Sequence, residues 1–152
     1  MLPTDQKGYE SALKNYLSKE KPAANNLEII ELDIPVATGF SNETIIFKAQ
    51  WEEEGKEQSE KFVGRIEPKD GGMFPVQHSG LEESCYLQHK IMQTVADQKV
   101  APMPELLSFE ENLEPLGRSF FAMGFVEGEI PSDNPRNNVP QIFLGHYNFI
   151  QV

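Results

Sequence analysis

Hydrophobic and polar residues alternate with helical spacing near the N-terminus. Five apolar or aromatic residues recur there at intervals of three and four, with lysine and glutamate between them: Tyr9, Ala12, Leu13, Tyr16 and Leu17. This spacing predicts an amphipathic helix over about residues 5–19, followed by a break at Pro22. We interpret residues 1–26 as an N-terminal helical extension.

Three runs after this helix have the pattern of β-strands. In 27–34 apolar residues nearly alternate with acids, and 43–51 and 61–66 are rich in β-branched and aromatic residues. A turn at 37–42 joins the first two runs, and we expect the charged stretch 52–60 to be the solvated connection to the third. The three runs therefore predict an antiparallel meander.

The second half of the chain predicts one more helix and two more strands. Leu81, Cys85, Met92 and Val95 share one helical face over 81–97, with Leu87 and Ile91 alongside, and Ser79 is a plausible N-cap. After Pro102 and Pro104 the segments 105–109 and 119–126 read as strands. We expect an α+β domain over 1–126, with a five-stranded antiparallel sheet, one packed helix and the N-terminal helix outside it.

Residues beyond this domain have a different character. The stretch 127–140 is rich in proline, glycine and asparagine and is typical of a linker or hinge. Residues 141–152 are apolar enough to need a partner surface, and none is evident in the sequence. They could pair within the molecule, between two copies, or with a further lobe.

Composition and charge narrow the possible partners. The chain has 152 residues, 39% of them hydrophobic, and a net charge of −11, which disfavours nonspecific binding to nucleic acid or to anionic membranes. A single cysteine fits a reducing compartment, and neither a signal peptide nor a membrane-spanning run is evident. We therefore expect a cytoplasmic protein.

The turn at 37–44 is the first candidate for chemistry. Gly39 lies among small polar residues, so a tight bend there can direct several backbone N–H groups to one side, as phosphate binding requires. An ordinary hairpin turn is the alternative. Cys85 and His89 lie one helical turn apart near Glu82, but without a distant further ligand they do not predict a metal site, and Cys85 on an apolar face does not predict a nucleophile.

The order of these elements and motifs carries a resemblance. The motifs are Gly39-Phe40-Ser41-Asn42-Glu43-Thr44, Phe62-Val63-Gly64-Arg65, Glu83 with Leu87, Pro102-Met103-Pro104, and the stretches 116–128 and 130–135. Together, over about 27–135, they resemble the nucleotide-binding N-terminal lobe of the aminoglycoside phosphotransferase and choline kinase-like family, which has a protein-kinase-like fold. The resemblance implies ATP and Mg²⁺ as cofactors and a small-molecule hydroxyl as the acceptor of the γ-phosphate.

The resemblance also implies roles for particular residues. Backbone N–H groups of the loop would cover the phosphates of ATP, and Arg65 would contact the α and β phosphates where such kinases usually have lysine. Glu83 would hold Arg65 by an ion pair, with Glu82 as the alternative. Met123 would border the adenine, while the Gly124 carbonyl and the Val126 N–H would form hinge contacts. The loop residues concerned are Thr38, Gly39, Phe40, Ser41 and Asn42.

Two glycines depart from the expected pattern. Gly64 stands where a β-branched residue or leucine is expected, which weakens the strand by about 0.5–1 kcal/mol and suggests close packing on the nucleotide. Gly124 stands where the family often has glutamate, and we expect it to make the hinge more flexible.

Catalytic residues are the larger departure. Phosphoryl transfer needs an aspartate that orients the acceptor hydroxyl, together with metal-binding Asn and Asp side chains. None of His78, His89 and His146 begins a His-x-Asp motif with an asparagine five residues later. We therefore expect no catalytic residue and no metal ligand in these 152 residues, and little or no activity from them alone. The alternative is a non-catalytic nucleotide- or protein-binding module derived from such a lobe.

Overall fold

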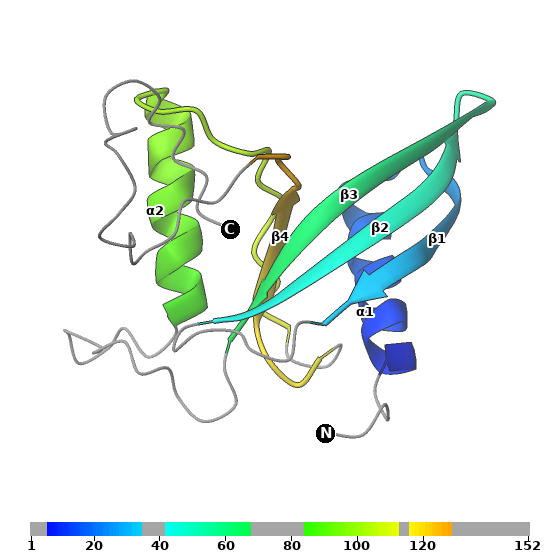
Figure 1. The fold of residues 1–152 in the computed structure, drawn as a ribbon, viewed down its shortest axis with the longest axis horizontal. Helices are drawn as coiled ribbons and strands as arrows, with labels where there is room; N and C mark the ends of the chain where they lie inside the picture. Colours follow the sequence, from blue (N-terminus) through cyan, green and yellow to red (C-terminus); the bar gives the residue numbers. More distant parts are fainter. Residues whose placement is uncertain (1–5, 35–41, 68–83, 113–115, 129–152) are drawn as a thin grey trace, which may run out of the picture.

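The computed structural model describes residues 6–34, 42–67, 84–112 and 116–128. In chain order the elements are α1 (Gln6–Glu20), β1 (Asn25–Asp33), β2 (Glu43–Glu53), β3 (Lys56–Ile66), α2 (Ser84–Gln98) and β4 (Phe120–Gly124). Figure 1 shows α1 behind β1 and β2, and α2 standing on the other side of the molecule beside β4. The fold class is α+β, as the sequence predicts.

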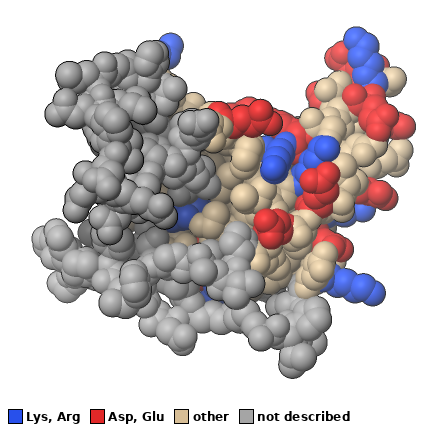
Figure 2. Space-filling view, in the orientation of Figure 1, with Lys and Arg blue, Asp and Glu red and all other residues tan. Residues whose placement is uncertain are grey.

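The sheet is antiparallel, with strand order β1-β2-β3-β4. The hairpin of β2 and β3 is longer than the sequence suggests, because the acidic stretch expected to be its loop continues the ladder to the pair Glu53 and Lys56. Glu54 and Gly55 form the turn, and both have positive φ, as a two-residue hairpin turn requires. The charged side chains remain solvated because this end of the hairpin projects from the molecule, where Figure 2 shows acidic and basic residues mixed.

The expectation of five strands is wrong, because the described sheet has four. The segment predicted as a strand at 105–109 runs beside β4 but makes only isolated bridges, at Leu106 and Glu110. The Leu107 N–H donates to the Ala122 carbonyl, and the Glu110 N–H donates to the Phe120 carbonyl. The distance in sequence from Leu107 to Glu110 is thus one residue longer than the distance from Ala122 back to Phe120. This shift in register interrupts the ladder, as a bulge does.

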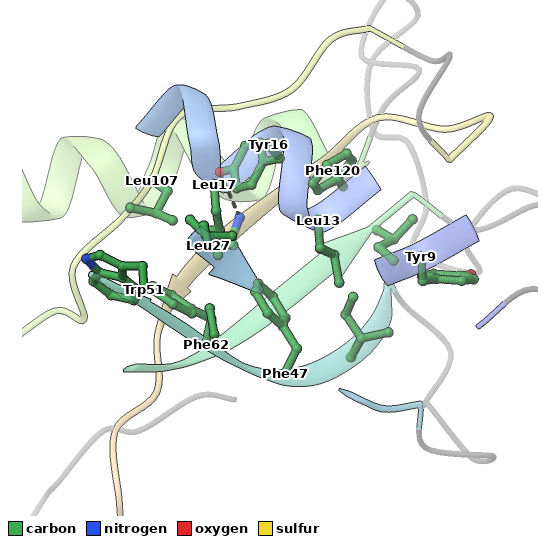
Figure 3. Packing of buried hydrophobic residues seen from close by; sticks show 14 residues of the cluster. Tyr9, Leu13, Tyr16, Leu17, Leu27, Phe47, Trp51, Phe62, Leu107 and Phe120 are labelled. Atoms are coloured by element: carbon green, nitrogen blue, oxygen red, sulfur yellow. Dashed lines mark hydrogen bonds between the residues drawn. The ribbon is translucent and has the colours of Figure 1, made fainter. Parts of the chain in front are cut away.

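Apolar residues on the two faces of the sheet form separate cores. The larger lies between α1 and the sheet, and Figure 3 shows its side chains meeting in that layer. All five residues predicted for the buried face of α1 are buried. The smaller core lies toward α2 and consists of Val63, Cys85, Phe121 and Met123, with partly buried neighbours.

Gly64 faces the α1 side, so the expectation that it packs on a nucleotide beside Arg65 is wrong. A Cβ atom at this position would lie 2.7 Å from Cγ1 of Ile45, which belongs to the larger core. The glycine therefore leaves room for a β2 side chain, and its neighbours Val63 and Arg65 point to the opposite face because side chains alternate along a strand.

Candidate functional site

Arg65 is a buried cation on the face of the sheet that α2 covers. It lies near the end of β3, opposite Thr44 of β2 and Phe121 of β4, and only 8% of it is exposed. One terminal nitrogen donates to the Thr44 hydroxyl, and Nε donates to Oε1 of Gln88 on α2 over 3.3 Å. The guanidinium is thus held between a strand and a helix.

Burial changes the electrostatics of this group. Desolvation lowers the pKa of the Arg65 guanidinium below its ordinary value, while the nearby Cys85 acts in the opposite direction. Arginine nevertheless stays protonated at neutral pH, because its ordinary pKa is so high. The site therefore holds a permanent positive charge in surroundings with little water, where electrostatic attraction is stronger than in bulk solvent.

Asn42, the last residue of the predicted loop, lies near Arg65 because both contact Gln88. It precedes β2 directly, is 4% exposed, and donates from Nδ2 to Oε1 of Gln88 over 2.8 Å. Gln88 thus contacts both Asn42 and Arg65, which are 23 residues apart in sequence and come from two different elements.

Sequence reasoning missed Gln88 although a signal was present. Cys85, Gln88 and Met92 occur at i, i+3 and i+7, so they share the helical face directed to the sheet. A glutamine on an apolar face has to find a polar partner when it is buried. That requirement could have singled it out.

The first turn of α2 is fixed to the end of β3. The backbone N–H of Cys85 donates to the Glu67 carboxylate over 2.6 Å, and the Cys85 thiol donates to the Arg65 carbonyl over 3.2 Å. The carboxylate satisfies a backbone donor at the positive end of the helix. Both contacts hold α2 against the residues that surround Arg65.

Met123 lies on the same face as Arg65, two cross-strand positions away. It pairs with Val63 across β3 and β4, and both side chains are buried in the smaller core. The face is therefore polar at Arg65 and apolar at Val63 and Met123. Farther along, a hollow of about 230 Å³ opens between Asp33, Ile46 and Lys61.

The chain leaves the sheet after Gly124, the last residue of β4. The Gly124 N–H donates to the Glu105 carbonyl over 2.8 Å, and the Phe125 N–H donates to the Lys61 carbonyl over 2.9 Å. The Lys61 ammonium lies 4.2 Å from the centroid of the Phe125 ring. Val126 is exposed. The segment that the sequence predicts as a hinge thus begins where β4 ends, on the border of the face that carries Arg65.

A comparison with known protein families identifies the chain. A family model named APH and described as the phosphotransferase enzyme family matches residues 34–145, well over half of the sequence. The chain belongs to this phosphotransferase family. The match includes the loop, Arg65, α2 and β4.

Several predicted site residues lie outside the described part of this phosphotransferase-family chain. They are Thr38, Gly39, Phe40, Ser41 and Glu83, together with Glu82 and the predicted N-cap Ser79. The predicted ion pair of Glu83 with Arg65 stays a prediction for this reason. So do the linker from residue 129 onward and the apolar tail at 141–152. Asn42, Arg65, Met123, Gly124 and Val126 are described, and they lie on or beside one face of the sheet.

The described ranges also bear on metal binding and on membrane insertion. Within them no three or more His, Cys, Asp or Glu side chains are grouped so that they could hold a metal ion. Neither α1 nor α2 is long and apolar enough to cross a bilayer.

Proposed function

We propose that this chain is the ATP-binding lobe of a small-molecule phosphotransferase, which passes the γ-phosphate of ATP to a hydroxyl acceptor. The observation that carries the proposal is the placement of Arg65. Its guanidinium is buried on the α2 face of β3, beside the residue that ends the predicted glycine loop and next to an apolar strip. Family membership supports phosphoryl transfer as the reaction class.

The geometry fits a ligand that has a flat apolar part and a polyanionic part. Arg65 offers planar N–H donors to phosphate oxygens, and its buried position strengthens that attraction. Val63 and Met123, which are buried in the smaller core on the same face, are apolar residues of the kind that would border an adenine. A net charge of −11 on the chain makes such a local cation necessary for binding a triphosphate.

No metal ligand for the transfer step is assigned among the described residues. These residues contain no suitable group of acidic, histidine or cysteine side chains, and the Glu43 and Glu67 carboxylates near the site are engaged with Arg118 and with the N–H of Cys85. Mg²⁺ would supply charge neutralisation on the phosphates. We propose that its ligands and the acceptor-orienting aspartate come from outside these 152 residues, and that these residues alone bind nucleotide without efficient turnover.

A thermal melt tests nucleotide binding. Mg-ATP at about 100 times its Kd should stabilise the folded chain by about 2.7 kcal/mol. Arg65→Ala should lose most of that shift, because the phosphates lose their buried cation. Lys56→Ala, at the exposed hairpin turn, removes the same charge far from the site and should keep the shift. An unchanged shift in Arg65→Ala, or no shift in the wild type, contradicts the proposal.

A non-catalytic binding module is the second candidate, and the surface of α2 favours it. Leu87 is 39% exposed and Ile91 is 56% exposed, and they lie one helical turn apart. Such a pair could contact a second lobe, another copy or a protein partner. If the chain forms dimers without nucleotide, Leu87→Glu with Ile91→Glu should make it monomeric in sedimentation, whereas monomers at every concentration would exclude self-association.

A further inference from the structure

We propose that Gln88 is a positioning residue that orients the Arg65 guanidinium and the end of the glycine loop as one unit. This inference rests on the proposed nucleotide-binding function. It assigns to a glutamine in the second turn of α2 a task that the family resemblance implies for Glu83.

The contact geometry fixes all three side chains. Oε1 of Gln88 accepts from Asn42 Nδ2 at 2.8 Å and from Arg65 Nε at 3.3 Å. Arginine Nε can only donate, so the carboxamide oxygen and not its NH₂ group has to face it. Asn42 must then turn its own NH₂ group toward the same oxygen. One acceptor with two lone pairs thus sets the orientation of a loop residue and of the cation.

The surroundings keep this acceptor in place. Gln88 lies one turn after Cys85, whose N–H and thiol are bound to Glu67 and to the Arg65 carbonyl. Its neighbour His89 is buried and its Nε2 lies 3.0 Å from the Leu107 carbonyl. The helix therefore cannot slide along the sheet without breaking these contacts. They fix the position of the backbone at Gln88.

An amide has a particular advantage in this position. A carboxamide orients the guanidinium without adding a negative charge, so the contact to Gln88 leaves the attraction of Arg65 for phosphate undiminished. Displacing Gln88, by moving α2, would release Arg65 and the loop end together.

The test compares Gln88→Met with Gln88→Glu. Methionine has nearly the same length and no comparable acceptor, whereas glutamate keeps acceptor oxygens. Gln93→Met is the matched control, since Gln93 is on the same helix and bonds only to Asp97 among the described residues, at an exposed site. The readout is the ratio of the Kd for adenosine to the Kd for Mg-ATP, which isolates the contribution of the phosphates and is insensitive to a general loss of stability.

Gln88→Met should lower this ratio about tenfold, as expected for losing a hydrogen bond to a charged group. Gln93→Met should leave it unchanged. Gln88→Glu should recover part of it, because the carboxylate restores the acceptor while its charge weakens the attraction of Arg65 for phosphate. The inference is overturned if Gln88→Met keeps the wild-type ratio, or if Gln88→Glu is as impaired as Gln88→Met.

A nucleotide-free measurement separates this inference from the proposed function. The Arg65 Nε–H proton should exchange slowly with solvent in the wild type and in Gln88→Glu, and at least tenfold faster in Gln88→Met. If the wild type binds no ATP but shows this pattern, the proposed function fails while the orienting contact stands. If exchange is equal in all variants, the contact itself is refuted.

Discussion

The two faces of the sheet are built for different purposes. Toward α1, fourteen described residues are buried in one continuous core, whereas toward α2 the buried apolar cluster has four members and lies beside a buried arginine. Hydrophobic burial is the main source of folding free energy. The α1 face therefore supplies most of the stability, and the α2 face can carry polar groups that a ligand uses.

The two arginines in the described part of the chain show the same contrast. Arg118 lies 2.6 Å from the Glu43 carboxylate and also donates to the Tyr9 hydroxyl and the Glu67 carbonyl, so it joins α1 to the sheet. Arg65 is oriented by the Thr44 hydroxyl and the Gln88 carboxamide, which are neutral. These two neutral contacts do not by themselves diminish the attraction of the Arg65 guanidinium for an anion.

The largest effect on stability should come from truncating the α1 core. Phe47→Ala removes a buried ring that stacks on Phe62 at a centroid distance of 5.3 Å, and we expect a loss of about 3–5 kcal/mol in urea unfolding. Ile91→Ala on the exposed side of α2 should change the free energy of unfolding by less than about 0.5 kcal/mol. Comparable losses of stability in both variants would contradict the view that the α1 face supplies most of the folding free energy.

Tyr16→Phe should cost about 1–3 kcal/mol, because it removes a hydroxyl that bonds to two backbone groups, one of them buried. The hydroxyl donates to the Ser108 carbonyl over 2.6 Å and accepts from the Ala122 N–H over 3.2 Å. Urea unfolding at neutral pH measures this loss. A variant as stable as the wild type would show that the hydroxyl contributes nothing to the α1 face.

The same residue makes stability depend on alkaline pH. Burial raises the pKa of the Tyr16 hydroxyl, so above about pH 10 the unfolded chain loses this proton while the folded chain keeps it. The contribution is complete below that pH and falls by about 1.4 kcal/mol per pH unit above it. The slope of stability against pH should be shallower by this amount in Tyr16→Phe, and equal slopes would contradict the assignment.

Two glycine variants probe smaller effects. Gly64→Ala places a Cβ 2.7 Å from the Ile45 side chain and should cost about 1–3 kcal/mol. At Gly124 an added Cβ finds its nearest neighbours at 3.8 Å, so Gly124→Ala should change stability by less than about 0.5 kcal/mol. Differential scanning calorimetry of both variants checks this order. The reverse order would show that Gly124, and not Gly64, is sterically required.

Periodicity predicted the parts of the fold that depend on burial. The apolar spacing of α1 identified its buried face completely, and the helix expected at 81–97 appears as α2, with residues 81–83 outside the described part. The sequence did not predict that the ladder of β2 and β3 continues into the charged stretch 52–60. Residues that are solvated on both faces of a strand show no alternation of apolar and polar side chains. The interrupted pairing of 105–110 depends on register with β4, which local sequence does not encode.

The candidate site was predictable only in part. The family resemblance pointed to Arg65, which the structure places in a buried position beside α2; its contact with a nucleotide stays a prediction. Gln88 and the packing of Gly64 against Ile45 arise from contacts between distant segments. Such contacts follow from tertiary structure, so a single sequence without its fold left them open.

The central claim is that nucleotide binds the α2 face of the sheet, and an NMR titration of the chain with Mg-ATP tests it most directly. We predict that backbone amide shifts concentrate at residues 42–46, 61–65 and 121–126 and saturate together. The same titration should leave the amides of α1 unchanged. Shifts that gather on α1, or that stay uniform across the sheet up to millimolar nucleotide, would contradict the claim.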